Sequence, residues 1–402
     1  SSKVAASNQT ETNGPGRFSP AGESGTVAAM DDAPSRLRVA HLYPLWRTPP
    51  GGDPEDSFGV IRNDLPAAIA RRGHDVVAYG VGPGWSNSAT TIDGVDHVLL
   101  GRGPDAITGR AQGALTKAQS RLRGTSHAAN SGPLFKAGYT SRAALDMRRR
   151  GVQVAHVHIF EQLVPLIRRL HPSAKIVFHM HDHKQTYRQH PGLEQRLASA
   201  DAIVGCSEFV TAAVQERFPS IADRCRTVPN GVDMSRFVGS PRPEGSGRRI
   251  LFVGRVSPEK GVHVLLEALK VVLPDRPDVH VEIVGKVAIP DIREIDPHGE
   301  NDLVSALAPY FEDKRSYQAL LDRLTEDLGG ERVIWTGSLG HSEIGEAYRR
   351  AAIFVFPVLW EEPFGLPINE AAAAGVPAIG SATGGIRETI EPEVTGMLVA
   401  PG

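Results

Sequence analysis

Two glutamates frame a Phe-Gly-Leu turn near the carboxyl end of the sequence. Glu362 and Glu370 stand eight positions apart, and the apolar run 353–360 before them is typical of a buried strand. Pro367 suits the first turn of a helix, and Gly375 suits its end. The turn would present backbone N–H groups and the positive end of a helix dipole to a phosphate, while the carboxylates accept hydroxyl groups. These features predict a ligand in which a diphosphate joins two polyols. The motif alone also fits solvated or capping glutamates.

A second motif supplies positive charge. Gly254, Arg255 and Lys260 follow an apolar strand expected over 249–253, and Lys260 is expected to enter a helix over 262–272. Ligands of open α/β sheets bind beyond the carboxyl ends of the strands. An arginine fork and a lysine point charge can converge there on a diphosphate. The alternative is two surface cations at a helix start, but the helix dipole disfavours cations at that end.

Glycine-rich turns complete the pattern. Asn230 and Gly231 form a tight-turn signal near the expected end of a domain. Gly384 and Gly385 follow a short strand expected over 377–381 and would allow the backbone to approach a ligand closely.

In order and spacing, the motifs GRxxxxKG, ExPFGLxxxE and GG-I-x-E resemble the family 4 glycosyltransferases, which are retaining enzymes. The resemblance covers residues 36–402 and is strongest over 228–261 and 333–402. It implies an α/β protein of the GT-B architecture, with two Rossmann-like, doubly wound domains facing across a cleft. It also implies a hexosyl-type transferase that is metal-independent and needs no cofactor.

The resemblance assigns donor-binding roles to residues within these motifs: Gly254, Arg255, Lys260, Phe364, Gly365, Leu366 and Glu370. The two cations hold the donor diphosphate, and the second glutamate accepts the ribose hydroxyls. Glu362 faces the donor sugar, and the amides of the Phe-Gly-Leu turn support phosphate and sugar. Catalytic roles fall to Arg255, Lys260, Glu362 and, from the amino-terminal half, His181.

The amino-terminal half fits the same plan less closely. A first strand is expected over 38–44, and Gly51 and Gly52 form the glycine loop expected after it. In the family this loop approaches the donor phosphates, so the resemblance assigns Gly52 to donor binding. An acidic stretch, 53–56, is interposed before the next helix.

A strand expected over 175–183 ends in His179, His181 and Asp182. By resemblance, His181 matches the histidine that many family members place against the donor sugar. Strand alternation puts His179 and His181 on one face, so a metal pair and a hydrogen-bonded core histidine stay open as alternatives. We expect no metal, because no third ligand has matching spacing and no Asp-x-Asp sits at an expected strand end.

The composition is that of a two-domain globular protein. The 402 residues exceed what one hydrophobic core usually serves, and strands alternate with helices without internal repeats. We expect a disordered tail over 1–35, an acceptor domain over 36–237, a polar linker over 238–248 and a donor domain over 249–402. By resemblance, closing helices are expected beyond the donor domain, and the sequence shows none.

Cysteine content indicates the cellular compartment, whereas the net charge does not identify a binding partner. A net charge of -2 and a hydrophobic content of 41% are ordinary for globular chains. Only Cys206 and Cys225 are present, so no disulfide framework is indicated and a reducing cytoplasm is the expected compartment. No apolar run approaches the roughly 20 residues of a membrane span.

The segment 101–150 is basic in an otherwise neutral sequence. It holds ten Lys and Arg against Asp105 and Asp146. A solvated basic surface is one interpretation. The other is a surface for an anionic or lipid-linked acceptor, or for peripheral contact with the acidic inner leaflet of a membrane. We expect no nucleic-acid partner, because the segment has two aromatic residues and no recognisable module.

The sequence thus predicts a retaining transfer of a sugar from a nucleoside-diphosphate sugar, UDP- or GDP-linked, to a hydroxyl acceptor. Two alternatives stay open: a nucleotide-sugar epimerase or hydrolase of the same architecture, and a non-catalytic scaffold that binds sugar nucleotides. A nicotinamide-dependent dehydrogenase is disfavoured, because no G-x-G-x-x-G follows the first strand.

Overall fold

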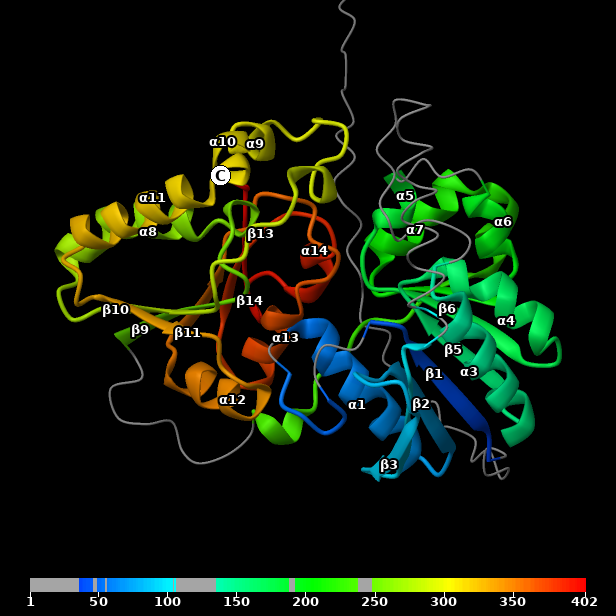
Figure 1. Ribbon diagram of the computed structural model, residues 1–402. Helices are drawn as coiled ribbons and strands as arrows, with labels where there is room; N and C mark the ends of the chain where they lie inside the picture. The colour runs from blue at the N-terminus through cyan, green and yellow to red at the C-terminus, as the bar shows by residue number, and fades with distance from the viewer. Residues whose placement is uncertain are drawn as a thin grey trace, which may run out of the picture. The chain divides into compact units, whose positions relative to one another are not determined.

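The structure is a computed structural model that describes residues 36–45, 49–54, 56–103, 105, 135–187, 192–237 and 248–402. The tail expected over 1–35 and nearly all of the linker expected over 238–248 lie outside these residues. The described chain contains two sheets, each with helices against it (Figure 1). No described helix combines the length and the apolar character that a bilayer span demands.

The amino-terminal sheet has the strand order β3-β4-β2-β1-β5-β6-β7-β8. Its neighbours pair in parallel except β3 and β4, which pair antiparallel. The strands are β1 (Arg38–Tyr43), β2 (Asp75–Val81), β3 (Ser88–Ile92), β4 (Val95–Leu100), β5 (Val154–His158), β6 (Lys175–Met180), β7 (Ala202–Gly205) and β8 (Cys225–Thr227).

Helices cover both faces of this sheet, with α1 on one side and α3 and α4 on the other (Figure 1). The longer helices are α1 (Ser57–Arg71), α3 (Ala137–Arg150), α4 (Val164–Leu170), α6 (Leu193–Ala198) and α7 (Glu208–Arg217), and α5 (Lys184–Tyr187) is a single turn. Helix α1 begins where the Asp56 side chain accepts a hydrogen bond from the Gly59 backbone N–H. Such a cap satisfies an amide that the helix itself leaves unpaired.

The carboxyl-terminal sheet has the order β11-β10-β9-β12-β13-β14, and all of its neighbours pair in parallel. The strands are β9 (Arg249–Val253), β10 (His280–Val284), β11 (Val333–Gly337), β12 (Ile353–Phe356), β13 (Ala378–Ser381) and β14 (Gly396–Val399). The helices are α8 (Val262–Val272), α9 (Asp302–Ser305), α10 (Ala308–Glu312), α11 (Lys314–Asp327), α12 (His341–Arg350), α13 (Leu366–Ala373) and α14 (Ile386–Thr389). Helices α8 and α11 lie on one side of the sheet, and α12 and α13 on the other (Figure 1).

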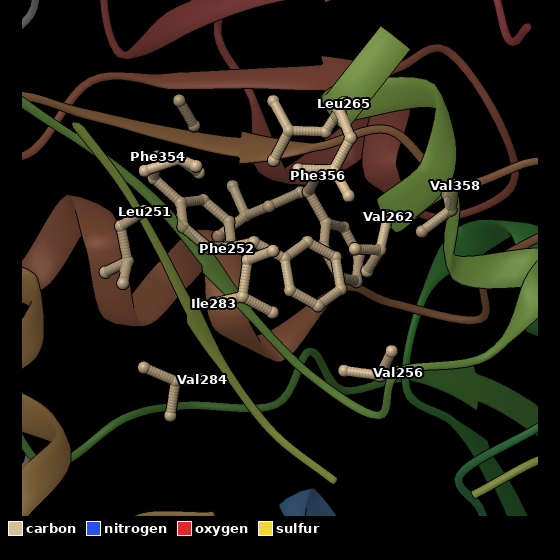
Figure 2. Close-up of a cluster of buried hydrophobic side chains, with 14 of the residues drawn as sticks. Leu251, Phe252, Val256, Val262, Leu265, Ile283, Val284, Phe354, Phe356 and Val358 are labelled. Carbon is tan, nitrogen blue, oxygen red and sulfur yellow. The ribbon is translucent and has the colours of Figure 1, made fainter. Parts of the chain in front are cut away.

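The core of this sheet is built from the central strands and the first helix. Leu251, Phe252, Ile283 and Phe354 are fully buried, and Leu265 of α8 packs among them (Figure 2). A strand covered on both faces is expected to be apolar at nearly every position, as β9 and β12 are. This core holds the ends of β9 and β12, and the candidate site lies in the loops beyond those ends.

The predicted α/β class with two doubly wound sheets is confirmed. The strand expected over 249–253 and the helix expected over 262–272 have the predicted bounds. Three local predictions were wrong. The strand expected over 175–183 ends at Met180, so His181 and Asp182 follow the strand. The strand expected over 353–360 ends at Phe356, because Pro357 follows and cannot donate to a ladder. Lys260 does not enter α8 but ends a single 3-10 turn, Pro258–Lys260, and Gly261 at φ 72° separates it from the helix.

Candidate functional site

Arg255 leaves the carboxyl end of β9 through Gly254, whose φ of 152° few other residues adopt. Its Nε donates to the Ser257 hydroxyl at 3.2 Å, and a terminal N–H donates to the Glu259 carboxylate at 2.6 Å. Glu259 is fully buried, and its Oε2 has no hydrogen-bond partner in the structure. The sequence analysis missed this carboxylate. It orients the guanidinium and leaves further N–H groups of Arg255 without an acceptor among the described residues.

Lys260 lies beside two aromatic rings and forms an ion pair with Glu362. Its Nζ donates to the Glu362 carboxylate at 2.5 Å and lies 5.3 Å from the ring centre of Phe356 and 5.2 Å from that of Trp360. The Trp360 indole N–H donates to the same Glu362 oxygen at 2.8 Å. The side chains of Lys260 and Glu362 are 12% and 13% exposed, so this ion pair is largely removed from water. Trp360 was not predicted, because a tryptophan at the end of an apolar run is usually core.

The two predicted motifs therefore meet through a direct contact. Lys260 comes from the turn after β9, and Glu362 comes from the loop after β12, the neighbouring strand. Carboxyl ends of adjacent parallel strands lie at one edge of a sheet, and this topology brings together residues about a hundred positions apart.

The glycine pair holds this loop in place. The Gly384 N–H donates to the Glu361 carboxylate at 2.5 Å, and the Gly385 N–H donates to the Glu362 carbonyl at 2.8 Å. A Cβ on Gly384 would lie 2.2 Å from the Glu362 carbonyl oxygen, and one on Gly385 would lie 2.3 Å from that of Pro363. The close approach expected toward a ligand is thus made to the loop that carries Glu362.

We expect Gly384→Ala to lower the free energy of unfolding by about 2–4 kcal/mol, because the new methyl group overlaps a carbonyl oxygen and the residue has φ 44°. Gly375→Ala is the matched control, since Gly375 has φ 70° but nothing within 4 Å of the added Cβ. It should cost only the strain of a positive φ, about 1–2 kcal/mol. Denaturant titration measures both variants, and equal losses would contradict the steric argument.

Glu370 lies in α13, one turn beyond the Phe-Gly-Leu turn, and is 5% exposed. The Tyr348 hydroxyl of α12 donates to its Oε2 at 2.8 Å, and among the described residues no other side chain donates to this carboxylate. Burial raises the pKa of Glu370 to about 7, against the opposing effect of the Tyr348 hydrogen bond. Near neutral pH the group is therefore divided between its two protonation states.

The Phe-Gly-Leu turn itself has the predicted form. Gly365 has φ 83° and precedes α13, with Pro367 in the first turn. The side chains of Phe364 and Leu366 are buried in the cluster that packs on the amino-terminal sheet. Among the described residues, none accepts a hydrogen bond from the amides of Phe364, Gly365 and Leu366, so the turn offers N–H groups to a ligand.

The glycine loop makes a contact that the sequence analysis missed. The Asp53 carboxylate accepts the Ser342 backbone N–H at 3.1 Å and the Ser342 hydroxyl at 2.6 Å, so it caps the start of α12. Gly52 accepts a hydrogen bond from the Asn63 side chain and lines a cavity of about 290 Å³ together with His341. No described contact joins Gly52 to Lys260 or Glu362, and its assignment to the donor stays a prediction.

His181 follows β6, and its ring packs edge-on against Phe58 of α1 with ring centres 5.4 Å apart. Its Nε2 lies 2.9 Å from Nδ1 of His158, and its Nδ1 is buried without a partner. Burial, with a smaller contribution from His179, holds the pKa of His181 well below its usual value, so the ring is neutral at physiological pH. His181 makes no described contact with Glu362. Two residues on, His183 lies against Trp360 with ring centres 6.0 Å apart.

Only part of the basic segment 101–150 lies within the described residues. Arg148, Arg149 and Arg150 form the exposed last turn of α3. Arg150 pairs with Asp146 at 2.7 Å and with Asp96 at 3.5 Å. The charge of this residue is therefore partly balanced locally.

Two family models match consecutive parts of the chain. The model described as Glycosyltransferase Family 4 matches residues 63–236, and the one described as Glycosyl transferases group 1 matches residues 237–402. The chain belongs to glycosyltransferase family 4. The predicted family is thereby confirmed.

Curated proteins similar to this family 4 chain carry several activities. It is 28% identical to YtcC of Bacillus subtilis over 66% of this chain and 64% of that protein. It is 27% identical to a lipopolysaccharide 1,2-N-acetylglucosaminetransferase of Salmonella typhimurium over 61% of this chain and 58% of that protein. It is 26% identical to a glycogen synthase of Mycobacterium tuberculosis over 90% of this chain and 82% of that enzyme. The chain thus spans less than two thirds of the first two of these relatives.

Solved structures agree on the fold. Sucrose-phosphate synthase from Thermosynechococcus elongatus superimposes with a TM-score of 0.61 at 19% identity, covering 91% of this chain and 86% of that one. The trehalose-6-phosphate synthase OtsA gives 0.63 at 13% identity, covering 90% and 88%. The expected GT-B architecture of family 4 is confirmed by these neighbours.

Proposed function

We propose that the protein is a retaining, metal-independent glycosyltransferase that moves a hexosyl-type sugar from a nucleoside-diphosphate sugar to a hydroxyl acceptor. The observation that carries the proposal is the contact between Lys260 and Glu362 beside Arg255, at the carboxyl edge of a doubly wound sheet. It joins the residues expected at a diphosphate to a carboxylate expected at a sugar.

In the proposed reaction, the bond between the anomeric carbon and the β-phosphate oxygen breaks as the acceptor oxygen attacks from the same face. The acceptor hydroxyl proton passes to the departing phosphate oxygen, so the products are the glycoside and the nucleoside diphosphate. Arg255 and Lys260 stabilise the charge that develops on the diphosphate. Two cations supply the countercharge that a divalent ion supplies elsewhere, and the step needs no protein nucleophile.

The electrostatics of the loop fit this division of roles. The Lys260 ammonium has three N–H groups, and one of them meets Glu362, so a phosphate oxygen can share the cation without breaking the pair. Glu362 is held by Lys260 and by Trp360, and this fixes the carboxylate that would receive the sugar hydroxyls. In its buried position Glu370 would take the ribose, and the amides of the Phe-Gly-Leu turn would face the phosphate.

The names of similar proteins support a nucleotide-sugar donor without fixing its base. HepE of Anabaena was solved with UDP and glucose, and a starch synthase of Arabidopsis thaliana with ADP and acarbose. A relative in Corynebacterium glutamicum is named as a GDP-mannose-dependent mannosyltransferase. We propose a UDP- or GDP-sugar as donor and a sugar or lipid-linked hydroxyl as acceptor.

A mass-spectrometric screen of a mixed nucleotide-sugar pool tests the function. We expect one donor to be consumed only when an acceptor is present, with release of its nucleoside diphosphate. Consumption in acceptor-free buffer at the same rate would support an epimerase or hydrolase instead. No change in any nucleotide sugar, together with retained nucleotide binding, would support a non-catalytic scaffold.

The exposed last turn of α3 gives a separate prediction about the acceptor. Replacing Arg148, Arg149 and Arg150 with Glu should reduce binding to anionic liposomes by about tenfold or more, because each basic residue near an acidic leaflet contributes about 1 kcal/mol. Nucleotide affinity should stay unchanged, since Arg255 and Lys260, the cations assigned to the diphosphate, follow a strand of the other sheet. The triple Lys variant keeps the charge and serves as the control. Unaltered liposome binding would leave this turn as a solvated basic surface.

A further inference from the structure

Five histidines gather on one face of the amino-terminal sheet, and they come from three adjacent parallel strands. His41 of β1 is in register with His156 of β5, and His158 of β5 is in register with His179 of β6. Side chains two residues apart on a strand share a face, so His181 joins the same set. The sequence analysis considered only His179 and His181, because the spacing of ligands along one segment cannot show residues on neighbouring strands.

Three of these rings approach each other closely enough to share an ion. One nitrogen from each of His158, His179 and His181 lies within 4.8 Å of the other two. Nδ1 of His158 and Nε2 of His181 are 2.9 Å apart. Tetrahedral coordination at 2.0–2.1 Å separates ligand nitrogens by about 3.3 Å, so the two rings need to part by only a few tenths of an ångström.

The outer histidines pair with the inner ones and set their tautomers. Nε2 of His158 meets Nδ1 of His41 at 3.1 Å, and Nδ1 of His179 meets Nε2 of His156 at 3.1 Å. If the inner rings donate in these bonds, Nδ1 of His158 and Nε2 of His179 carry lone pairs. A hydrogen bond on the far ring nitrogen is the arrangement that metal-ligating histidines usually have.

A buried nitrogen without a partner points to the same ligand. His179 is 4% exposed, and its Nε2 has no hydrogen-bond partner, which is unfavourable for a polar atom away from water. Phe58 closes the cluster from α1, with its ring 5.4 Å from that of His181 and 6.5 Å from that of His158. A cation bound by the three neutral imidazoles would satisfy Nε2 of His179 and would take the place of the contact between His158 and His181.

We propose that His158, His179 and His181 form a binding site for a divalent first-row transition ion such as Zn²⁺, with His41 and His156 as the outer shell. Imidazole ligands suit Zn²⁺, Cu²⁺ and Ni²⁺ more than Mg²⁺ or Ca²⁺. The site is distinct from the diphosphate residues and does not depend on the proposed function. An ion on Nε2 of His181 would leave the ring proton on Nδ1, and so fix the tautomer of the histidine assigned to the donor sugar.

A second triad, His41, His156 and His158, also offers one nitrogen from each ring within 4.8 Å. Its burial is similar, because each triad has two buried histidines and one partly buried histidine. In that arrangement the bond between His41 and His158 would be replaced by the ion and would no longer orient a ligand. The triad with His179 and His181 keeps both outer pairs intact, and this favours it.

The test is a titration of the untagged, chelator-treated full chain with Co²⁺ as a spectroscopic probe for Zn²⁺. We expect one equivalent to bind with the intense visible absorption of a four-coordinate ion, and Zn²⁺ to displace it. Elemental analysis after dialysis gives an independent stoichiometry. No binding by the wild type, or only the weak absorption of a six-coordinate surface ion, would overturn the proposal.

Histidine variants show which rings bind the ion and how much each contributes to the affinity for Co²⁺. His179→Gln and His158→Gln should weaken Co²⁺ binding at least a hundredfold, and His156→Gln, in the outer shell, by about 10–100-fold. His263→Gln is the control, because His263 is a partly buried histidine of helix α8 that contacts Tyr317. It should bind Co²⁺ like the wild type. Unchanged binding in His181→Gln with loss in His41→Gln would place the ion in the triad of His41, His156 and His158 and contradict the assignment.

Discussion

Lys260→Met should lower the affinity for the nucleoside diphosphate by tenfold to about a hundredfold, and turnover by a larger factor. A hydrogen bond from a charged group to a charged ligand contributes about 1.5–3 kcal/mol, and each 1.4 kcal/mol is tenfold in affinity. Loss of one preorganised donor to the charge of a transition state typically costs a further 10²–10³ in kcat. Methionine keeps an apolar stem against Phe356 and Trp360, so packing changes little.

The ion pair with Glu362 supplies the necessary control. Lys260→Met leaves the Glu362 carboxylate without its cation beside the proposed diphosphate, and that repulsion alone could weaken binding. Adding Glu362→Gln removes the charge. If Lys260 binds phosphate, the double variant stays weak; recovery of wild-type affinity would contradict the phosphate assignment. Lys270→Met is a matched lysine control, because Lys270 of α8 is partly exposed and pairs with Glu267 and Asp327.

Arg255→Ala should produce a similar loss of nucleotide affinity with an additional cost in stability. Removal of the guanidinium leaves the fully buried Glu259 carboxylate with only the Ser257 hydroxyl as a donor among the described residues. Breaking a buried pair in this way is destabilising. Nucleotide affinity and stability should therefore also be measured for the double variant Arg255→Ala/Glu259→Gln, which removes the unpaired charge of Glu259.

Glu370→Gln should stabilise the folded protein at pH 8 by about 3 kcal/mol. The pKa of Glu370 is about 7 in the folded protein, against the ordinary 4.5. One pKa unit corresponds to about 1.4 kcal/mol, and two to three units give the stated magnitude. The cause is burial of the ionised carboxylate, and glutamine removes the charge while it still accepts the hydrogen bond from Tyr348.

The sign of the pH dependence follows from the raised pKa. Between about pH 4.5 and 7 the folded state holds a proton that the unfolded state has lost, so the contribution of Glu370 to stability falls as pH rises. The difference between variant and wild type should therefore grow across this window, level off above pH 7 and vanish below pH 4.5. Denaturant unfolding at several pH values measures it, and a difference that is constant with pH would contradict the buried carboxylate.

Glu282→Gln should show the opposite trend and makes a useful control. Burial raises the pKa of Glu282, but hydrogen bonds and charge from Arg249 and Arg350 outweigh it and hold the pKa below its usual value. Its ionised form is thus favoured in the folded state. The stability difference from wild type should be present at neutral pH and shrink as the pH is lowered.

The motifs after β9 and β12 could be predicted from the sequence because strand, turn and helix signals are local. The apolar run 249–253, the glycine at 254 and the apolar helix pattern over 262–272 each report on a few neighbouring residues, and the structure has those bounds. The spacing between Glu362 and Glu370 likewise reflects one turn and one helix.

Other parts of the site depend on contacts between distant segments and could not be predicted. Trp360 meets Lys260, and Tyr348 meets Glu370, only because β9, β12 and their helices pack together. The same holds for the three-strand histidine cluster, in which register between β5 and β6 decides which rings meet. The role of Asp53 depends on a distant segment in the same way, because its carboxylate caps the start of α12.

Calorimetric titration of UDP, GDP and ADP into the wild-type protein tests the donor site most directly. We predict that at least one of these nucleotides binds without added metal, and that the same nucleotide binds Lys260→Met at least tenfold more weakly and Lys270→Met with wild-type affinity. Absence of binding by all three, or equal binding by the two lysine variants, would contradict the account of the site.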